Sequence, residues 1–276
     1  RFYAEEEKDD PVFAARLAAF ADIYVNDAFG TAHRAHASTE GIARLLPAVA
    51  GFLMEKEILF LGRLLENPGR PYLAVLGGAK VSDKLKVIKN LLGRVDAIAI
   101  GGAMAYTFLK AGGARVGMSL VEDEMLGSAS EIMEAAASKK VIFLLPSDHV
   151  VASAVSEDAA PQAADEKGIP EGLIGLDIGP ETVKKYGEVI KTAKTIFWNG
   201  PMGVFEMKPF SKGTYEVAAM IAASGATTVV GGGDSISALK KSGYEDKISH
   251  ISTGGGASLE FLEGLELPGI KALNNR

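Results

Sequence analysis

The chain has 276 residues, 47% apolar and 23% charged, which is enough for one or two folded domains and excludes a largely disordered protein. Its 35 acidic and 29 basic residues give a net charge of −6, which argues against a general nucleic-acid surface because such surfaces are basic. The absence of cysteine excludes a disulfide framework, a thiolate nucleophile and a cysteine-ligated zinc site. We therefore expect a cytoplasmic protein that binds neither nucleic acid nor membranes.

The first part of the chain predicts a helix, a strand and a polar turn. Residues 5–20 begin with acidic side chains and carry an apolar stripe, so they predict one surface helix with Pro11 in its first turn. Residues 23–25 predict a short strand, which a polar turn follows at 26–34.

A long amphipathic helix is predicted at 52–65, and we interpret it as a spacer between two domains. After it, apolar runs alternate with helix-like stretches. The strands are predicted at 72–76, 97–100, 141–145, 195–198, 227–230 and 248–251. The helices are predicted at 82–92, 103–111, 122–138, 181–191, 211–224 and 235–241. This alternation predicts an α/β fold with a parallel sheet covered on both faces, interrupted by an irregular excursion at 151–178.

Glycine is the compositional outlier, with 32 of 276 residues, or about 12% against a usual value of about 7%. Five of the six predicted strands end in a glycine cluster, at 77–78, 101–102, 200–203, 231–233 and 254–256. The carboxyl ends of parallel strands share one edge, which is where open α/β sheets bind ligands. Because glycine lets backbone N–H groups approach an anion, we predict a phosphate-rich ligand there.

The ligand class is narrowed by motifs that are missing. No G-x-G-x-x-G follows a strand, which argues against a dinucleotide oxidoreductase, and the sequence has no P-loop. Instead, Lys80 and Lys84 stand four residues apart at the start of a predicted helix, where two cations favour contact with phosphate. Lys86 and Lys89 are interpreted as a solvated helix face.

Two carboxylates accompany these glycines. Asp234 lies between the 231–233 cluster and Ser235, where a carboxylate beside phosphate implies a hard cation such as Mg²⁺. It could also cap the helix that starts there, and the two roles are compatible. Glu206 could accept hydrogen bonds from ribose hydroxyls or simply be solvated. His33 and His36 are interpreted as structural, because no catalytic or metal-binding spacing surrounds them.

Six segments closely resemble the phosphoglycerate kinase family, in that family's order and over nearly the whole chain. They are VNDAFGTAHRAHAST (25–39), LGGAKVSDK (76–84), GGAMAYTFL (101–109), FWNGPMGVFE (197–206), GGGDS (231–235) and HISTGGGASLE (250–260). The resemblance implies two Rossmann-like α/β domains joined by a long helix. It also implies a reversible glycolytic reaction in which phosphoryl moves directly from 1,3-bisphosphoglycerate to MgADP, giving 3-phosphoglycerate and ATP. Such transfer depends on positioning and charge neutralisation.

The resemblance also implies roles for individual residues. Arg1 and Arg34 would contact the phosphate of 3-phosphoglycerate, since the arginine fork binds phosphate oxygens in pairs. Asp234 would bind Mg²⁺ and Glu206 would hold the ribose. The nucleotide-binding set would be Lys84, Gly101, Gly102, Gly175, Asn199, Glu206, Gly233, Asp234, Ser235 and Ile236. The catalytic set, around the transferred phosphoryl, would be Lys80, Lys84, Gly254, Gly255 and Gly256.

By this resemblance the chain divides into four parts. Residues 1–50 would be the remnant of an N-terminal 3-phosphoglycerate-binding domain, 51–67 the interdomain helix, 68–265 the nucleotide-binding domain and 266–276 a tail returning to the N-terminal domain. Since the chain opens on Arg1 without methionine, we expect the C-terminal part of a monomeric enzyme, able to bind nucleotide with little transfer activity. A non-catalytic nucleotide-binding module is the alternative.

Overall fold

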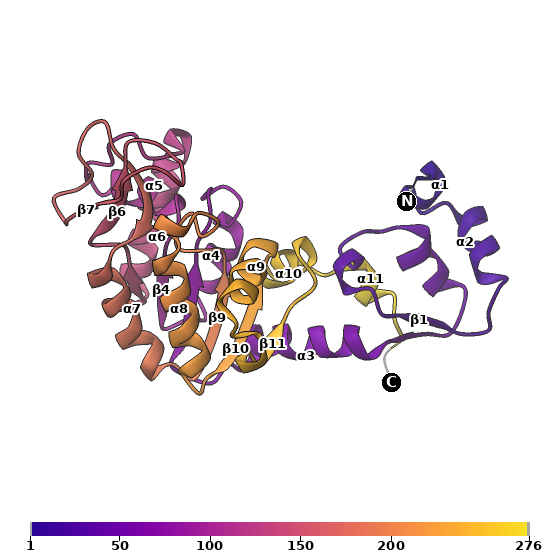
Figure 1. Ribbon diagram of the computed structural model, residues 1–276. Coiled ribbons are helices and arrows are strands. Elements are labelled where there is room, and N and C mark those ends of the chain that lie inside the picture. Colours follow the sequence, from indigo (N-terminus) through magenta and orange to yellow (C-terminus); the bar gives the residue numbers. More distant parts are fainter. Residues whose placement is uncertain (1, 275–276) are drawn as a thin grey trace. The chain divides into compact units, whose positions relative to one another are not determined.

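The computed structural model describes residues 2–274, and its contacts divide the chain into two compact units (Figure 1). The first unit combines the residues up to Asn67 with those from Ser252 onward, and the second is the continuous segment Pro68–Ile251. Residues 252–265, which we expected in the nucleotide-binding domain, therefore group with the N-terminal segment. No helix in residues 2–274 has the length and apolar character that a membrane span needs.

The second unit is built around a six-stranded sheet in which every paired strand is parallel. The strand order is β11-β10-β9-β3-β4-β5. The strands are β3 (Tyr72–Leu76), β4 (Ala97–Ile100), β5 (Ile142–Leu144), β9 (Thr195–Asn199), β10 (Thr227–Gly231) and β11 (His250–Ile251). The predicted parallel α/β architecture is confirmed.

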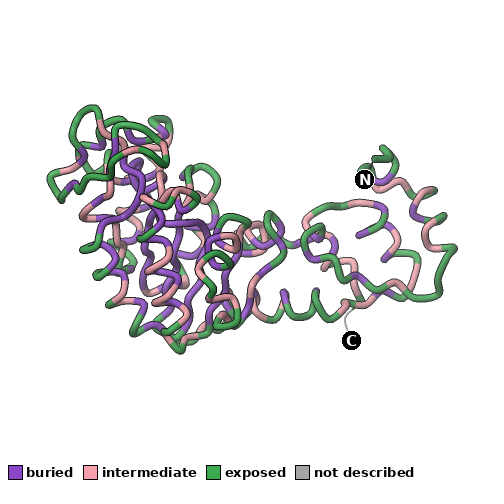
Figure 2. Tube along the Cα trace, viewed as in Figure 1, coloured by how far each residue is buried: buried purple, intermediate pink, exposed green. Residues whose placement is uncertain are grey.

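Helices cover both faces of this sheet, which gives three layers. They are α4 (Leu85–Leu91), α5 (Met104–Ala111), α6 (Leu126–Ser138), α7 (Pro180–Thr192), α8 (Lys212–Ala223) and α9 (Gly233–Ser242). Alternate strand residues such as Val75 and Trp198 pack against α7, α8 and α9, which lie side by side (Figure 1). The intervening residues, such as Ala74 and Ile98, are buried as well. Figure 2 shows these buried positions following the strands of the second unit. Burial on both faces explains why the strands read as continuous apolar runs.

The strand order reverses between β3 and β9. From β3 the chain proceeds outward to β4 and β5, whereas β9 lies on the other side of β3 and leads to β10 and β11. In the register, Leu76 is paired with Asn199, so Gly77 and Gly200 follow side by side at the carboxyl ends. A crevice at such a reversal is the usual ligand site of an open α/β sheet.

The segment 151–178, predicted as an irregular excursion, contributes strands to an antiparallel sheet with the order β7-β6-β8, and loops join these strands. Its strands are β6 (His149–Ala152), β7 (Gln162–Ala164) and β8 (Ile174–Ile178). Pro161 and Pro170 precede β7 and β8 instead of interrupting them, so neither proline removes a ladder hydrogen bond. The prolines mark the turns between strands.

The first unit combines a two-stranded parallel sheet with several helices. Its strands are β1 (Tyr24–Asn26) and β2 (Ala48–Ala50), and its helices are α1 (Ala4–Glu7), α2 (Pro11–Ala18), α3 (Phe52–Glu66), α10 (Gly256–Leu262) and α11 (Pro268–Lys271). Short 3₁₀ or π turns occur in both units, at Phe29–Thr31, Ala37–Gly41, Ile42–Arg44, Asp123–Met125, Lys208–Phe210 and Glu245–Lys247.

The single helix predicted at 5–20 is wrong, because the chain breaks between α1 and α2. Asp9 has a left-handed backbone with φ of 54°, and Asp10 is extended at φ −62° and ψ 124°. Pro11 disfavours a helical conformation for the residue before it, so Asp10 becomes a cap that accepts a hydrogen bond from the N–H of Phe13 at 2.8 Å. The proline therefore starts a second helix.

The last described residues bind to the N-terminal part of the first unit. The N–H of Gly269 donates to the carbonyl of Ala32 at 2.8 Å, and the N–H of Asn274 donates to the carbonyl of Ala48 at 2.9 Å. Ala48 in turn donates to Oδ1 of Asn274 at 2.7 Å. The first unit is thus assembled from two segments separated by the whole of the second unit.

Candidate functional site

Two cavities lie in the second unit, next to the carboxyl ends of β3 and β9. The first, here called the apolar pocket, has a volume of about 300 Å³, and the second, the polar pocket, about 180 Å³. The two cavities share Gly78, Ala79 and Asp234 in their walls, so they adjoin. Together they offer an apolar site that continues into a polar one.

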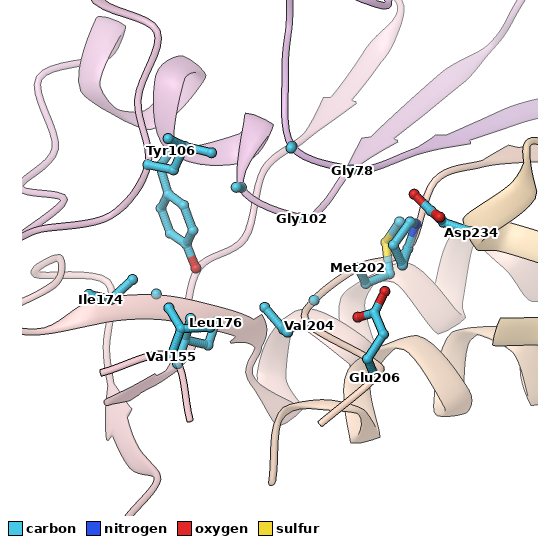
Figure 3. Close-up of a pocket in the computed structure, with 16 residues that line it drawn as sticks. Gly78, Gly102, Tyr106, Val155, Ile174, Leu176, Met202, Val204, Glu206 and Asp234 are labelled. Carbon is cyan, nitrogen blue, oxygen red and sulfur yellow. The ribbon is translucent and has the colours of Figure 1, made fainter. Parts of the chain in front are cut away.

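The apolar pocket is lined by small and hydrophobic residues with few charges. Its walls are Gly78, Ala79, Gly102, Ala103, Tyr106, Leu120, Val155, Ile174, Gly175, Leu176, Pro201, Met202, Gly203, Val204, Glu206 and Asp234. Figure 3 shows Tyr106 beside the strand that carries Ile174 and Leu176, while Glu206 and Asp234 lie at the other end near Met202. The pocket therefore has an apolar body with carboxylates at one end, which suits a flat ring bearing a hydroxylated group.

Two glycines allow the backbone segments around this pocket to approach closely. At Gly175, a Cβ atom would stand 2.1 Å from the hydroxyl oxygen of Tyr106. Gly102 has a φ of 66°, and its Cβ would stand 2.5 Å from the backbone nitrogen of Gly78. A side chain at either position would displace the pocket wall.

The ring of Tyr106 is held in place by His149 of β6. The ring centroids are 5.4 Å apart, and the Tyr106 hydroxyl is 3.5 Å from Nδ1 of His149. Burial lowers the pKa of His149 to about 4, against the opposing effect of Asp148, so the imidazole is neutral near neutral pH. A neutral imidazole can accept a hydrogen bond from the phenol.

Thr214 fixes the turn that carries Met202 to Glu206, and Asp177 fixes the start of α8, the helix that carries Thr214. The Thr214 hydroxyl accepts hydrogen bonds from the N–H groups of Met202 at 3.0 Å and of Gly203 at 3.2 Å. Asp177 accepts one from Gly213 at 2.7 Å, at the start of α8. Burial raises the pKa of Asp177 to about 7, although hydrogen bonds from Gly213 and Ile178 oppose this.

The polar pocket brings cations, carboxylates and backbone N–H groups together. Its lining is Gly78, Ala79, Lys80, Asp83, Lys84, Asn199, Gly200, Gly232, Gly233, Asp234 and Ser235. Lys84 donates from Nζ to Oδ1 of Asn199 at 2.7 Å, and Ser235 accepts a short hydrogen bond from the N–H of Gly200. Helix α9 begins at Gly233, so its unpaired N–H groups lie at this pocket.

Lys84 is partly desolvated in this pocket. Burial lowers the pKa of its ammonium group, while the nearby carboxylates of Asp83 and Asp234 act in the opposite direction. An anion bound beside this side chain would favour the ammonium form.

The two pockets gather most of the nucleotide-binding residues expected from the sequence. Of that set, the polar pocket contains Lys84, Asn199, Gly233, Asp234 and Ser235, and the apolar pocket contains Gly102, Gly175, Glu206 and Asp234. The polar pocket also contains Lys80, which was expected in the catalytic set. Gly101 and Ile236 line neither. A Cβ at Gly101 would stand 2.5 Å from the sulfur of Met202, and the N–H of Ile236 bonds to Gly232 at 3.0 Å within the first turn of α9.

The remaining expected residues belong to the first unit. Arg34 is exposed, and Gly254, Gly255 and Gly256 lead into α10, with Gly255 at a φ of 52°. A Cβ at Gly254 would stand 2.2 Å from the hydroxyl oxygen of Ser258. Arg1 lies outside the described residues.

A metal ion would have few protein ligands at this site. Within residues 2–274 no three histidine or carboxylate side chains form a metal-binding group. Asp234 nevertheless lines the polar pocket together with the side chains of Asn199 and Ser235. This arrangement fits Mg²⁺, which is usually bound through one or two carboxylates plus substrate phosphates.

Sequence reasoning missed the residues that support the two pockets. Tyr106, Glu122 and Asp177 are buried and come from α5, from the loop before the Asp123–Met125 turn and from β8. The sequence predicts a helix at 122–138 that includes Glu122. In the structure, Glu122 precedes a 3₁₀ turn at Asp123–Met125, and α6 follows that turn. No spacing in the sequence distinguishes these residues, because the contacts of Tyr106 with His149, of Glu122 with Val81 and of Asp177 with Gly213 span 43, 41 and 36 residues.

Comparison with known proteins agrees with the family resemblance seen in the sequence. The profile of the phosphoglycerate kinase family matches residues 1–265. Phosphoglycerate kinase of Anaeromyxobacter sp. (strain K) is 58% identical over 273 residues, covering 99% of this chain and 69% of that protein. The enzyme of Moorella thermoacetica is 57% identical over 276 residues, covering 100% of this chain and 70% of that protein.

Solved structures give the same result. The structure of phosphoglycerate kinase from Coxiella burnetii has a TM-score of 0.95 and 46% identity, covering 99% of this chain and 70% of that chain. For the enzyme from Pyrococcus horikoshii OT3 the values are 0.84 and 39%, with the same coverage. With its parallel sheet, glycine-lined pockets and these matches, the chain belongs to the phosphoglycerate kinase family.

Proposed function

We propose that this kinase transfers the 1-phosphoryl group of 1,3-bisphosphoglycerate to MgADP, giving 3-phosphoglycerate and ATP, in a reversible glycolytic reaction. One observation carries the proposal: an apolar pocket and a polar pocket adjoin at the reversal of strand order and share Asp234. A nucleotide needs this sequence of environments, because its base is apolar and its phosphates are charged.

The adenosine would occupy the apolar pocket. Its base would lie against the wall that Tyr106, Gly102 and Gly175 form, with Gly101 behind it holding Met202 close. The ribose hydroxyls would donate to the carboxylate of Glu206, which stands at the end of this pocket near Asp234 (Figure 3).

The phosphates would occupy the polar pocket. Lys84 would pair with their oxygens, supported by Asn199, and the first turn of α9 would offer the N–H groups of Gly233, Asp234 and Ser235. Asp234 would hold Mg²⁺ together with phosphate oxygens, and that ion supplies positive charge against the phosphates when bound.

Lys80 and Lys84 would neutralise charge on the moving phosphoryl group, the turn at Gly254–Gly256 would offer backbone N–H groups, and Arg34 with Arg1 would hold the phosphate of 3-phosphoglycerate. No covalent intermediate is needed, since phosphoryl transfer depends mostly on positioning and charge neutralisation. This assignment rests on the family resemblance.

The domain roles are part of the same proposal. Residues 1–50 would belong to the glycerate-binding domain, 51–67 to the interdomain helix and 68–251 to the nucleotide-binding domain. Residues 252–265, which we expected in the nucleotide-binding domain, group with the first unit, and 266–276 would be the returning tail. We place the enzyme in the cytoplasm as a monomer, and the lack of cysteine is compatible with a reducing compartment.

Calorimetric titration with MgADP tests the nucleotide site. The wild-type chain should bind MgADP, and it should bind ADP only weakly when Mg²⁺ is omitted. Lys84→Ala and Asp234→Ala should each weaken binding by about 10- to 100-fold, the range of one charge-assisted hydrogen bond. Lys86→Ala, which removes an exposed lysine of α4, is the matched control and should bind as the wild type does. Unchanged affinity in both site variants would mean that the site is elsewhere.

A polypeptide limited to these 276 residues would, we propose, bind nucleotide with little phosphoryl transfer. The reason is that this chain covers 70% of each relative, so about 30% of the relative's length has no counterpart in these 276 residues. A coupled assay with 1,3-bisphosphoglycerate and MgADP decides this. Turnover well above background would refute both low activity and the alternative of a non-catalytic nucleotide-binding module.

A further inference from the structure

Glu122 is a buried carboxylate behind the turn that carries the two lysines of the polar pocket. Only 9% of its surface is exposed. Its Oε2 accepts hydrogen bonds from the N–H groups of Val81 at 2.5 Å and Ser82 at 3.2 Å, and its Oε1 accepts one from the Ser82 hydroxyl at 2.5 Å. Lys80 and Lys84 flank these two residues in the chain, so the carboxylate fixes the backbone between them.

These backbone groups depend on a side-chain acceptor. Helix α4 begins only at Leu85, so the N–H groups of Val81 and Ser82 lie before its hydrogen-bonding pattern. Val81 is fully buried. A buried N–H that loses its partner destabilises its conformation by about 1–3 kcal/mol. Without the carboxylate, the turn would be expected to move until the N–H of Val81 reached water.

Glu122 is also fixed from the side of the apolar pocket. Its own N–H donates to the hydroxyl of Thr107 at 3.1 Å. Thr107 is buried in α5, directly after Tyr106, whose ring lines the apolar pocket. The carboxylate therefore connects the helix beside the apolar pocket with the turn beside the polar one.

The electrostatic state of Glu122 suits this role. Burial by itself would raise the pKa of the carboxyl group, but the hydrogen bonds from Ser82 and Val81 and the charge of Lys80 outweigh it, so the pKa lies below the ordinary value. The group is therefore ionised at neutral pH, with both oxygens available as acceptors.

We propose that Glu122 is a positioning residue for phosphate binding: by hydrogen bonding to the 80–84 turn, it holds Lys80 and Lys84 at the polar pocket. This role rests on the proposed nucleotide-binding function. It predicts that the loss of Glu122 affects ligands according to their phosphates. Adenosine, which would need only the apolar pocket, should be unaffected, whereas MgADP should bind less tightly.

Three variants test this role. Glu122→Ala removes every side-chain hydrogen bond to the turn. Glu122→Gln keeps an oxygen for the two backbone N–H groups, while its amide can donate to the Ser82 hydroxyl, so it should rescue the function. Glu124→Ala is the matched control, because it removes an exposed glutamate two residues away.

The readout is calorimetric binding of adenosine and of MgADP, with folding checked by thermal unfolding. We expect Glu122→Ala to weaken MgADP binding about tenfold, equivalent to about 1.4 kcal/mol, and to leave adenosine within about twofold of the wild type. Glu122→Gln should return MgADP binding to within about threefold of the wild type, and Glu124→Ala should match the wild type for both ligands.

Several results would overturn the proposal. They are an equal loss for adenosine and MgADP in Glu122→Ala, no loss for either, or a Glu122→Gln variant no better than the alanine. If Glu122→Ala does not fold, Ser82→Ala removes one of the three bonds and should weaken MgADP binding about threefold without affecting adenosine; an unchanged MgADP affinity would then refute the role. A wild-type chain that binds neither ligand would instead contradict the proposed function, and this role with it.

Discussion

Two buried groups of the antiparallel sheet should give the second unit opposite dependences of stability on pH. Burial lowers the pKa of His149 from 6.5 to about 4 and raises the pKa of Asp177 from 3.8 to about 7. In the register of β6 and β8, His149 is opposite Ile178 and Val150 is opposite Asp177. Because successive strand residues point to opposite faces, the two groups lie on different faces and should titrate independently.

The signs follow from which state binds the proton. Between pH 6.5 and about 4, the unfolded chain protonates His149 and the folded chain does not, so the free energy of unfolding falls as pH falls. Between pH 3.8 and about 7, the folded chain keeps a proton on Asp177 and the unfolded chain does not, so this free energy falls as pH rises. Each slope is about 1.4 kcal/mol per pH unit, so the two cancel wherever both act.

Single substitutions should therefore reveal slopes that the wild type hides. From about pH 6.5 down to about pH 4.5, His149→Gln should gain about 3 kcal/mol relative to the wild type, from two pH units at about 1.4 kcal/mol each. Asp177→Asn should lose about the same amount relative to the wild type over that interval. Any lost packing or hydrogen bond shifts each difference by a constant and leaves its slope unchanged.

Urea unfolding at several pH values, followed by tryptophan fluorescence, measures these differences. Trp198 is the sole tryptophan of the sequence and is fully buried in β9, so its emission reports the second unit. Difference curves that are flat, or that slope in the same direction for both variants, would refute the reasoning.

Two further outcomes are expected. Burial lowers the pKa of Lys84, and bound phosphate favours its ammonium form, so MgADP binding at alkaline pH should take up protons. The binding heats measured in two buffers of different ionisation enthalpy should therefore differ, and equal heats would contradict this. Gly175→Ala would place a methyl group 2.1 Å from the Tyr106 hydroxyl and displace the ring, so adenosine affinity should fall at least about tenfold. The control Gly127→Ala places its methyl group where no atom lies within 4 Å and should bind adenosine normally. Normal binding by both variants would show that the Tyr106 ring does not shape the pocket.

The sheet of the second unit was predictable because its strands are buried on both faces. The runs at 72–76 and 97–100 match β3 and β4 residue for residue, since continuous apolar runs ending in glycine leave little choice of boundary. The antiparallel sheet was not predictable. Its strand at 162–164 has two exposed residues and one buried one, so it carries no apolar run.

The candidate site divides in a similar way. The glycine turns and the two lysines follow directly from the strands before them, so their meeting at one edge could be inferred from topology alone. The support behind them could not be inferred. Glu122 reaches Val81 across 41 residues of sequence, and no periodicity relates one buried carboxylate to one turn at that separation.

The discontinuity of the first unit has a consequence for the order in which the protein folds during synthesis. The second unit is one continuous segment, so its sheet can close once β11, ending at Ile251, has left the ribosome. The partner of Ala48 is Asn274, which is synthesised 226 residues later. Until then β2 lacks that bond, so the first unit remains incomplete while the second unit can already fold. Translation thus imposes an order on folding: the second unit can fold first, and the first unit, whose two segments lie on either side of it in the chain, folds last.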